Sequence, residues 1–181
     1  MSAGHGHIDP SNKKIALLIA VLALVLAFSE TLGKSAQTNA LSRNIEASNL
    51  WSFFQAKTIR QTVVRTAAEQ TSLGGSSEEA KKQIEAWRKT AQRYQTEPET
   101  GEGRDELMAR AKEAEKKRDR SMAAYHHYEL ASAAVQIAIV LASAAIVTGA
   151  MALAWIGAGL GVVGVAFCLI GFFAPASVHI F

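Results

Sequence analysis

The longest feature of the hydropathy pattern is an apolar block from Ala133 to Phe173 that contains no charged residue. A single helix of this length, with about 1.5 Å of rise per residue, would be about 60 Å long, roughly twice the 30 Å hydrocarbon core of a bilayer. The block therefore predicts two membrane-spanning helices, over residues 128–148 and 151–173. A tight turn at Thr148-Gly149-Ala150 would join them, and because this turn has no proline, a break nearer Trp155-Ile156-Gly157 is the alternative.

A second apolar run, from Ile15 to Phe28, follows two lysines and is short for a span on its own. One interpretation is the hydrophobic region of a signal peptide, with a small-residue cleavage site at Ala27-Phe28-Ser29. We favour an uncleaved span over residues 15–33, which places Glu30 in its last turn. Glu30 is then either an interfacial residue with a structural role or an intramembrane acid with a function.

The segment between these spans, residues 34–127, predicts a helical stalk. Residues 35–70 contain no proline or glycine, and their apolar positions project as two stripes on roughly opposite sides of one helix. The first stripe contains Leu41, Ile45, Ala56, Ile59, Val63 and Ala67, and the second contains Leu50, Phe53, Phe54 and Val64, with Trp51 at its flank.

A helix that is apolar on two sides needs a partner on each side. One partner is the chain's own returning helix, and the other is a second subunit. We therefore expect a homo-oligomer. The residues expected at the subunit contact are Leu50, Trp51, Phe53, Phe54, Gln55 and Arg60.

The rest of the stalk predicts two shorter helices, over about 77–95 and 105–127, separated by a loop around Pro98. Ser76-x-x-Glu79 has the pattern of a capping box at the start of the first. Their summed length is close to that of 35–70, which favours an antiparallel, coiled-coil-like hairpin. The expected fold is an all-α membrane protein with three transmembrane helices and a stalk between the first and second. Residues 1–14 are expected to be a disordered tail and 174–181 a C-terminal stub.

Charge distribution predicts the orientation of this fold. The chain has 19 Lys and Arg against 16 Asp and Glu, a net charge of +3. Most basic residues lie in the stalk, and positive charge near span ends marks the cytoplasmic side, so we expect a cytoplasmic stalk. No basic stripe is interleaved with aromatic residues, which excludes a nucleic-acid face. The single cysteine, Cys168, lies in the last apolar segment and is expected to pack there.

Tyr125-His126-His127-Tyr128-Glu129 is the polar stretch that enters the second span. His126 and Glu129 share a helix face at the i,i+3 spacing of carboxylate–histidine metal sites. A histidine beside an acid is also a candidate pH sensor. The third interpretation is an interfacial belt of Tyr and His rings. Near the N-terminus, His5, His7 and Asp9 are either metal ligands or part of a solvated tail.

The last span contains a face of small residues that includes Gly157, Gly161 and Gly164. Small residues at this spacing let helix backbones approach closely in lipid, so we expect them to pack against another helix. A phosphate-binding loop is excluded because the glycines lie in an apolar span without a following Lys-Ser or Lys-Thr. No catalytic motif is present, and we expect no enzyme activity, no cofactor and no small-molecule substrate.

Three stretches carry a resemblance to a known family. They are Phe28-Ser-Glu-Thr-Leu-Gly-Lys34, the segment 46–60 with its Asn-Leu-Trp-Ser-Phe-Phe-Gln-Ala-Lys core, and the segment from Arg118 to Ala131. The chain resembles the bacterial membrane proteins called domain of unknown function four-three-three-seven. The resemblance implies a multi-pass protein of the bacterial inner membrane with one N-terminal and two C-terminal spans. It also draws attention to a candidate polar network: Asn49, Trp51, Gln55, Lys57 and Arg60.

Two function classes remain at this stage. The leading hypothesis is a homo-oligomeric, non-enzymatic membrane scaffold whose partners are the lipid bilayer and further copies of the chain. The alternative is an oligomeric channel or transporter-like pore that uses Glu30 or the His126/Glu129 region.

Overall fold

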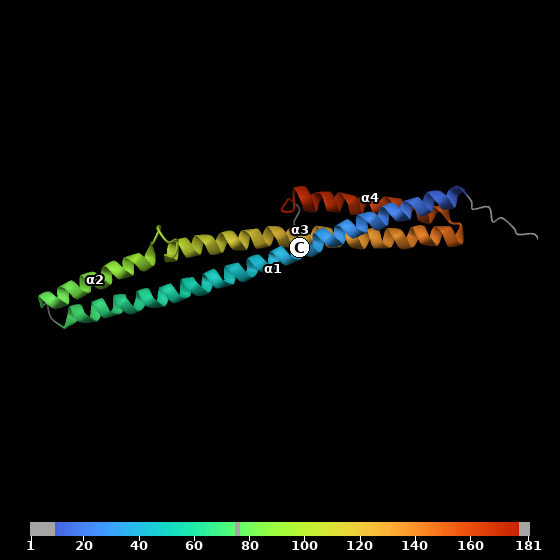
Figure 1. The fold of residues 1–181 in the computed structure, drawn as a ribbon. Helices are drawn as coiled ribbons and strands as arrows, with labels where there is room; N and C mark the ends of the chain where they lie inside the picture. The colour runs from blue at the N-terminus through green and yellow to red at the C-terminus, as the bar shows by residue number, and fades with distance from the viewer. Residues whose placement is uncertain (1–9, 75–76, 178–181) are drawn as a thin grey trace, which may run out of the picture. The chain divides into compact units, whose positions relative to one another are not determined.

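A computed structural model describes residues 10–74 and 77–177, and its regular structure there is entirely α-helical (Figure 1). The helices are α1 (Pro10–Leu73), α2 (Glu78–Gln95), α3 (Arg104–Thr148) and α4 (Met151–Phe173). The chain forms two compact units: unit 1 comprises residues 1–40 and 119–181, and unit 2 comprises residues 41–118. Helices α1 and α3 each contribute one part to each unit.

The start of α1 differs from the expected disordered tail, because residues 10–14 are helical. Pro10 is the first helical residue, where its fixed φ and missing N–H are well tolerated. The candidate ligands His5, His7 and Asp9 lie outside the described residues.

Unit 1 is a packing of three helices: the first part of α1, the second part of α3, and α4. Ile15 packs with Ala142 and Ala145, and Leu22 packs with Val135 and Ala138. Leu153, Ala154 and Leu160 of α4 border the same two clusters. The alanines on α3 keep the side chains short, which brings the helices close together.

Three helices in the described part of the chain are long and apolar enough to cross a membrane: α1 from Asn12 onward, α3 and α4. Many of their large apolar side chains point outward in the single chain, including Val147, Trp155 and Phe173. Between α3 and α4, Gly149 has a φ of 72°, a left-handed conformation that glycine adopts without steric cost. The chain reverses there, at the turn that the sequence predicted.

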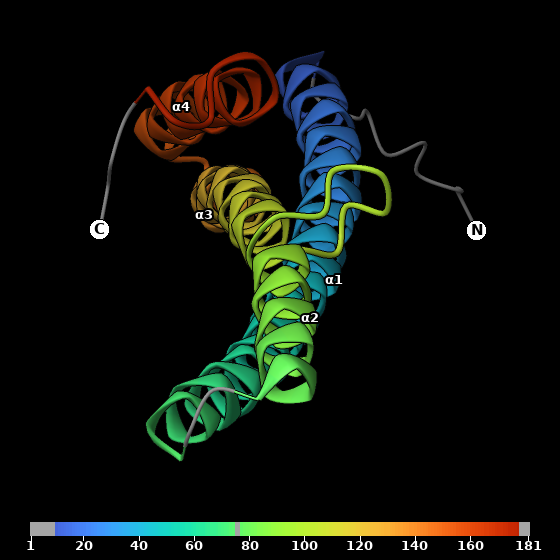
Figure 2. The same ribbon diagram turned by 90° about the vertical axis from the view of Figure 1, so that its left-hand side faces the viewer.

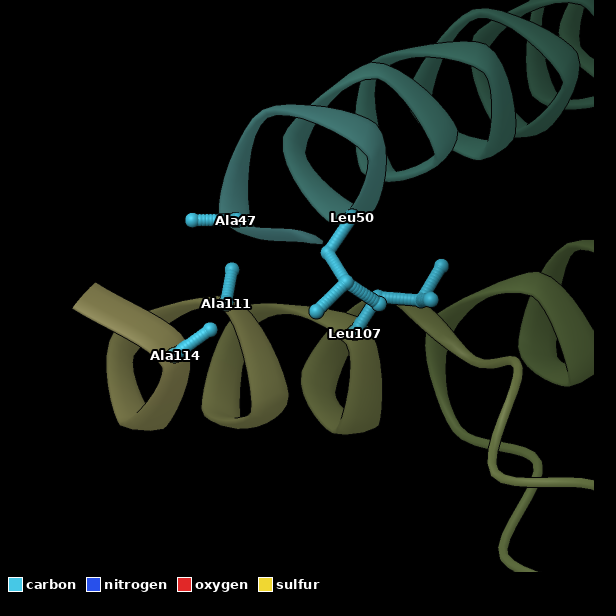
Figure 3. Close-up of a cluster of buried hydrophobic side chains, with 5 residues drawn as sticks. All are labelled: Ala47, Leu50, Leu107, Ala111 and Ala114. Carbon is cyan, nitrogen blue, oxygen red and sulfur yellow. The ribbon is translucent and has the colours of Figure 1, made fainter. Parts of the chain in front are cut away.

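Unit 2 combines the second part of α1 with α2 and the first part of α3. Figures 1 and 2 show α2 lying along the C-terminal part of α1. Figure 3 shows Leu50 of α1 and Leu107 of α3 pointing toward one another, with Ala47, Ala111 and Ala114 beside them. Trp51, Phe53 and Phe54 pack against this cluster.

Helix α2 begins one residue later than the capping box predicted. Its N-cap is Ser77, whose hydroxyl accepts a hydrogen bond from the backbone N–H of Ala80 at 3.1 Å. Ser77 has the extended backbone, φ −64° and ψ 154°, that an N-cap requires. The predicted cap, Ser76, lies outside the described residues.

Candidate functional site

Unit 1 contains a groove of about 480 Å³ between α1 and α3, whose largely apolar lining carries several polar and charged side chains. Its polar lining comes from two helix faces that meet along the groove. Among the lining residues are Glu30, Lys34 and Gln37 of α1, and Tyr125, Glu129 and Gln136 of α3. The groove therefore brings together Glu30 and Glu129, two of the acids that the sequence singled out, and adds Lys34 to them.

Contacts between the helices show how far the groove reaches into the apolar part of unit 1. A Cβ at Gly33 would lie 3.4 Å from the Cβ of Tyr128, and one at Gly171 would lie 3.1 Å from the ring of Tyr128. Gly33, Tyr128 and Gly171 therefore lie at the same level, near the end of α4. Measured from this level along the helix axes, Glu30 lies about one turn farther into the apolar part of unit 1 on α1, and Gln136 lies about 12 Å farther on α3.

The two deepest polar residues of the groove are joined. Gln136 Nε2 donates a hydrogen bond of 3.4 Å to Glu30 Oε1, and both side chains are exposed in the single chain. Beyond them unit 1 is apolar: Leu22 on α1 faces Val135 and Ala138 on α3. The groove thus ends in an amide–carboxylate pair at the depth of the candidate spans.

His126 and Glu129 lie near the mouth of the groove. His126 Nδ1 is 3.6 Å from Glu129 Oε2, and the hydroxyl of Tyr125 donates to Glu129 Oε1 at 3.5 Å. The side chains of His126 and Glu129 are 43% and 60% exposed. The i,i+3 pair is therefore brought together. Within the described residues of one chain, however, no three His, Cys, Asp or Glu side chains are grouped to hold a metal.

The sequence placed the neighbouring His127 in the interfacial belt of Tyr and His rings and did not predict its burial. His127 is 1% exposed and stacks on Phe167, and its Nε2 lies 3.2 Å from the carbonyl oxygen of Pro175. A carbonyl only accepts, so Nε2 carries the proton, and His127 ties the segment after α4 to α3. The sequence contained a signal for this burial, because His127 shares a helix face with the apolar residues Ala131 and Val135, at four-residue intervals.

Unit 2 contains a polar network where the returning helix is broken. Lys57 is 6% exposed; its Nζ lies 3.5 Å from Glu97 Oε2 and 3.8 Å from Glu102 Oε2. The same ammonium group lies 5.5 Å from the ring centroids of Phe53 and of Tyr94. Ion pairs and cation–π contacts together compensate the burial of this charge.

Gln61 is the second α1 residue in this network. Its Nε2 donates to the carbonyl oxygen of Ala91 at 2.9 Å and to Gln95 Oε1 at 3.1 Å. Its Oε1 accepts a hydrogen bond from Arg104, whose guanidinium also stacks over the Phe54 ring at 5.0 Å. Gln61 thus connects the end of α2 to the start of α3.

The break in the returning helix lies beside these polar side chains of α1. Gly101 has a φ of 66°, and a Cβ at Gly103 would lie 2.5 Å from the backbone nitrogen of Glu97. Side chains of α3 satisfy backbone groups of this loop: Glu106 Oε2 accepts from the N–H of Glu97 at 3.3 Å, and Arg110 donates to the carbonyl oxygen of Gly101 at 3.3 Å. Near the break, a hydrogen bond from Arg93 lowers the pKa of the Glu97 carboxyl below its ordinary value of 4.5.

The residues expected to form a subunit contact divide into two groups. Leu50, Trp51, Phe53 and Phe54 pack within unit 2, and Trp51 Nε1 donates to Glu115 Oε1 at 2.9 Å. Gln55 and Arg60 are exposed, as is Asn49 from the candidate network. Lys57 and Trp51 do form buried polar contacts, but with their own chain.

The apolar stripe that remains outward in unit 2 is therefore the other one. Leu41, Ile45, Ile59 and Val63 are 61%, 53%, 64% and 61% exposed. Ser48 and Ser52 lie between them and are also exposed. Projected at 100° per residue, the face within about 60° of this stripe carries no charged residue between positions 35 and 70. We call this surface the neutral face.

The three glycines singled out in α4 are all buried against the other helices of unit 1. A Cβ at Gly157 would lie 2.8 Å from the carbonyl oxygen of Ala138. At Gly161 and Gly164 it would lie 2.5 Å from Leu22 Cδ2 and Val135 Cγ2. The small-residue face thus faces the chain's own α1 and α3.

These features define a helical protein with three candidate membrane spans and a separate polar helical unit between the first and second. Comparison with family models identifies the family of this helical protein. The chain belongs to the family described as Domain of unknown function (DUF4337), whose model matches residues 11–174, and the resemblance seen in the sequence is confirmed. Searches of curated proteins and of solved structures found no match.

Proposed function

We propose that this protein is a homo-oligomeric, non-enzymatic scaffold of the bacterial inner membrane. Unit 1 anchors it through three transmembrane helices, and unit 2 lies in the cytoplasm and assembles with further copies. The observation that carries the proposal is the neutral face of unit 2, which leaves four large apolar side chains exposed beyond the span that the sequence predicts over residues 15–33.

Several properties of the neutral face favour a second copy of the chain as its partner. Its apolar and small residues recur every three or four positions from Leu41 to Val63, as in a coiled-coil seam. A symmetric contact places each patch against itself, and the absence of charge removes repulsion between like charges. Ser48 and Ser52 at the centre are small enough to let two helices approach closely.

The shared bilayer fixes the direction of the paired helices. Two copies anchored in one membrane present their α1 helices in parallel, so each residue of the neutral face meets its own counterpart. An antiparallel pair would instead place Ser48 opposite Ala56, with only Ser52 near its counterpart. The two arrangements therefore differ in which single cysteines can form a disulfide.

Disulfide formation in native membranes tests the proposal. In a Cys168→Ser background, Ser48→Cys and Ser52→Cys should each give a disulfide-linked dimer on mild oxidation. Lys112→Cys, on an exposed position of α3, is the matched control and should stay monomeric. Dimers from Ser52→Cys alone would contradict the parallel arrangement, and none from either serine variant would contradict assembly through this face.

The pore alternative has one observation in its favour, because Glu30 and Glu129 line the same groove. Helix α4 carries no charged residue along its whole length, so a conducting path would depend on α1 and α3 alone. A polar path would then have to pass the apolar contacts of Leu22 with Val135 and Ala138. These contacts favour the scaffold.

A further inference from the structure

We propose that the groove of unit 1 binds the headgroup of a zwitterionic aminophospholipid. The ammonium group of the lipid lies between Glu30 and Glu129, and its phosphate lies against Lys34. This inference rests on the proposed membrane embedding of unit 1, and it assigns a ligand to a site that the scaffold function does not use.

The charges of the groove select this class of headgroup. Two carboxylates and one ammonium group line it, so it offers acceptors for a primary amine and one cationic donor for a phosphate. An anionic headgroup without an amine would meet two negative charges and only one positive charge. Among the described residues no ion pair within 4 Å is found for Lys34, which leaves its ammonium group to a ligand.

The position of the groove supports a lipid over a soluble ligand. The mouth lies at the level of Gly33, Tyr128 and Gly171, at the end of α4, where interfacial headgroups are expected. Polar side chains at span depth are costly when they face hydrocarbon. Glu30 and Gln136 are both exposed there, and a bound headgroup would cover them with polar atoms.

The volume of the groove is also large enough for a phospholipid headgroup. At about 480 Å³ it lies within the usual range of about 300–1,000 Å³ for small-ligand sites. That volume accommodates a phosphoethanolamine group with part of the glycerol.

Native mass spectrometry of the intact protein in detergent tests the assignment. Phosphatidylethanolamine, phosphatidylcholine and phosphatidylglycerol with identical acyl chains are added separately, and the lipid-bound fraction is measured. We expect phosphatidylethanolamine to be retained about tenfold better than phosphatidylglycerol, since its primary amine makes charge-assisted hydrogen bonds to the carboxylates that phosphatidylglycerol cannot make. Phosphatidylcholine should bind less well than phosphatidylethanolamine because its quaternary ammonium cannot donate a hydrogen bond.

Two substitutions locate the site. Glu30→Gln and Lys34→Gln should each lower retention of phosphatidylethanolamine about tenfold, whereas Glu46→Gln, an exposed carboxylate of unit 2, should leave it unchanged. Size-exclusion profiles verify that the variants remain folded, and Lys34→Gln provides an independent reading if Glu30→Gln misfolds.

Equal retention of the three lipids, or wild-type retention in both variants, would overturn the inference. Soluble phosphoethanolamine is added as a competitor: displacement at equal concentration would assign the groove to a free amine-phosphate and overturn the lipid. The Ser48→Cys disulfide is measured on the same preparations. If the protein shows no lipid selectivity but still forms the dimer, the lipid site alone is contradicted. If it forms no dimer but keeps its lipid selectivity, the scaffold alone is contradicted.

Discussion

At the scale of single residues, the polar side chains of α1 in unit 2 are explained by the loop that they face. Gln61 satisfies the carbonyl oxygen of Ala91 and accepts from Arg104, and Lys57 is paired with Glu97. Each would be an unusual choice for a buried helix position if the returning helix were continuous. Both side chains link α1 to the end of α2, to the loop and to the start of α3.

The substitution Gln61→Leu tests this explanation. Leucine has nearly the same size, but it removes the hydrogen bonds of Gln61 to the Ala91 carbonyl, to Gln95 and from Arg104, which should lower stability by about 1–3 kcal/mol. Thermal unfolding of the full-length protein, followed by circular dichroism, measures the loss. Gln83→Leu, on the exposed side of α2, is the control and should change stability by less than about 0.5 kcal/mol. Equal effects of the two substitutions would argue against the network.

At the scale of elements, glycines fix the position of α4 in unit 1. The closest approach is at Gly157, where α4 meets the backbone of α3 at Ala138. Gly159 lies two residues along the same helix, and a Cβ there would meet nothing within 4 Å. The two glycines therefore differ in environment while sharing helix propensity and depth.

Substituting valine at Gly157 and at Gly159 separates the effect of close helix packing on stability from the effect of helix propensity. Gly157→Val should lower the thermal unfolding midpoint in detergent. The added side chain would collide with the backbone of α3 at Ala138, which cannot move aside as a flexible side chain can, and such overpacking costs about 1–3 kcal/mol. Gly159→Val should leave the midpoint unchanged or raise it slightly. The close packing of α4 on α3 would be refuted by equal midpoints for the two variants.

At the scale of the whole molecule, the chain segregates its chemistry between the two units. Unit 1 contains the apolar segments of the candidate spans, and unit 2 contains the ion pairs of α2 and α3, such as Glu85 with Lys89 and Glu113 with Lys117. The concentration of basic residues in residues 34–127 favours a cytoplasmic unit 2.

Cysteine labelling tests that orientation. In a Cys168→Ser background, a membrane-impermeant maleimide added to intact cells with a permeabilised outer membrane should label Ala150→Cys, at the turn between α3 and α4. It should leave Lys112→Cys, in unit 2, unlabelled until the inner membrane is opened. The reverse pattern would place unit 2 on the outside and contradict the proposed topology.

The sequence by itself determined the local structure of this protein. Hydropathy and the 3.6-residue period placed the long helices, and Gly149 and Pro98 marked the breaks between them, because these signals depend on neighbours in the chain. Periodicity also identified both apolar stripes of α1 and the glycine face of α4. The family resemblance rested on the same local residues.

Tertiary structure alone decided which of these surfaces are covered. Nothing in the period of α1 distinguishes the Leu50 stripe from the Leu41 stripe; α3 covers the first because Leu107, Ala111 and Ala114 are in register with it. Other contacts likewise depend on how separate segments of the chain align: the partners of Lys57 and Gln61, the carbonyl bound by His127, and the groove lined by Glu30, Lys34 and Glu129. Such contacts join residues far apart in the chain, and local pattern does not specify how two helices align.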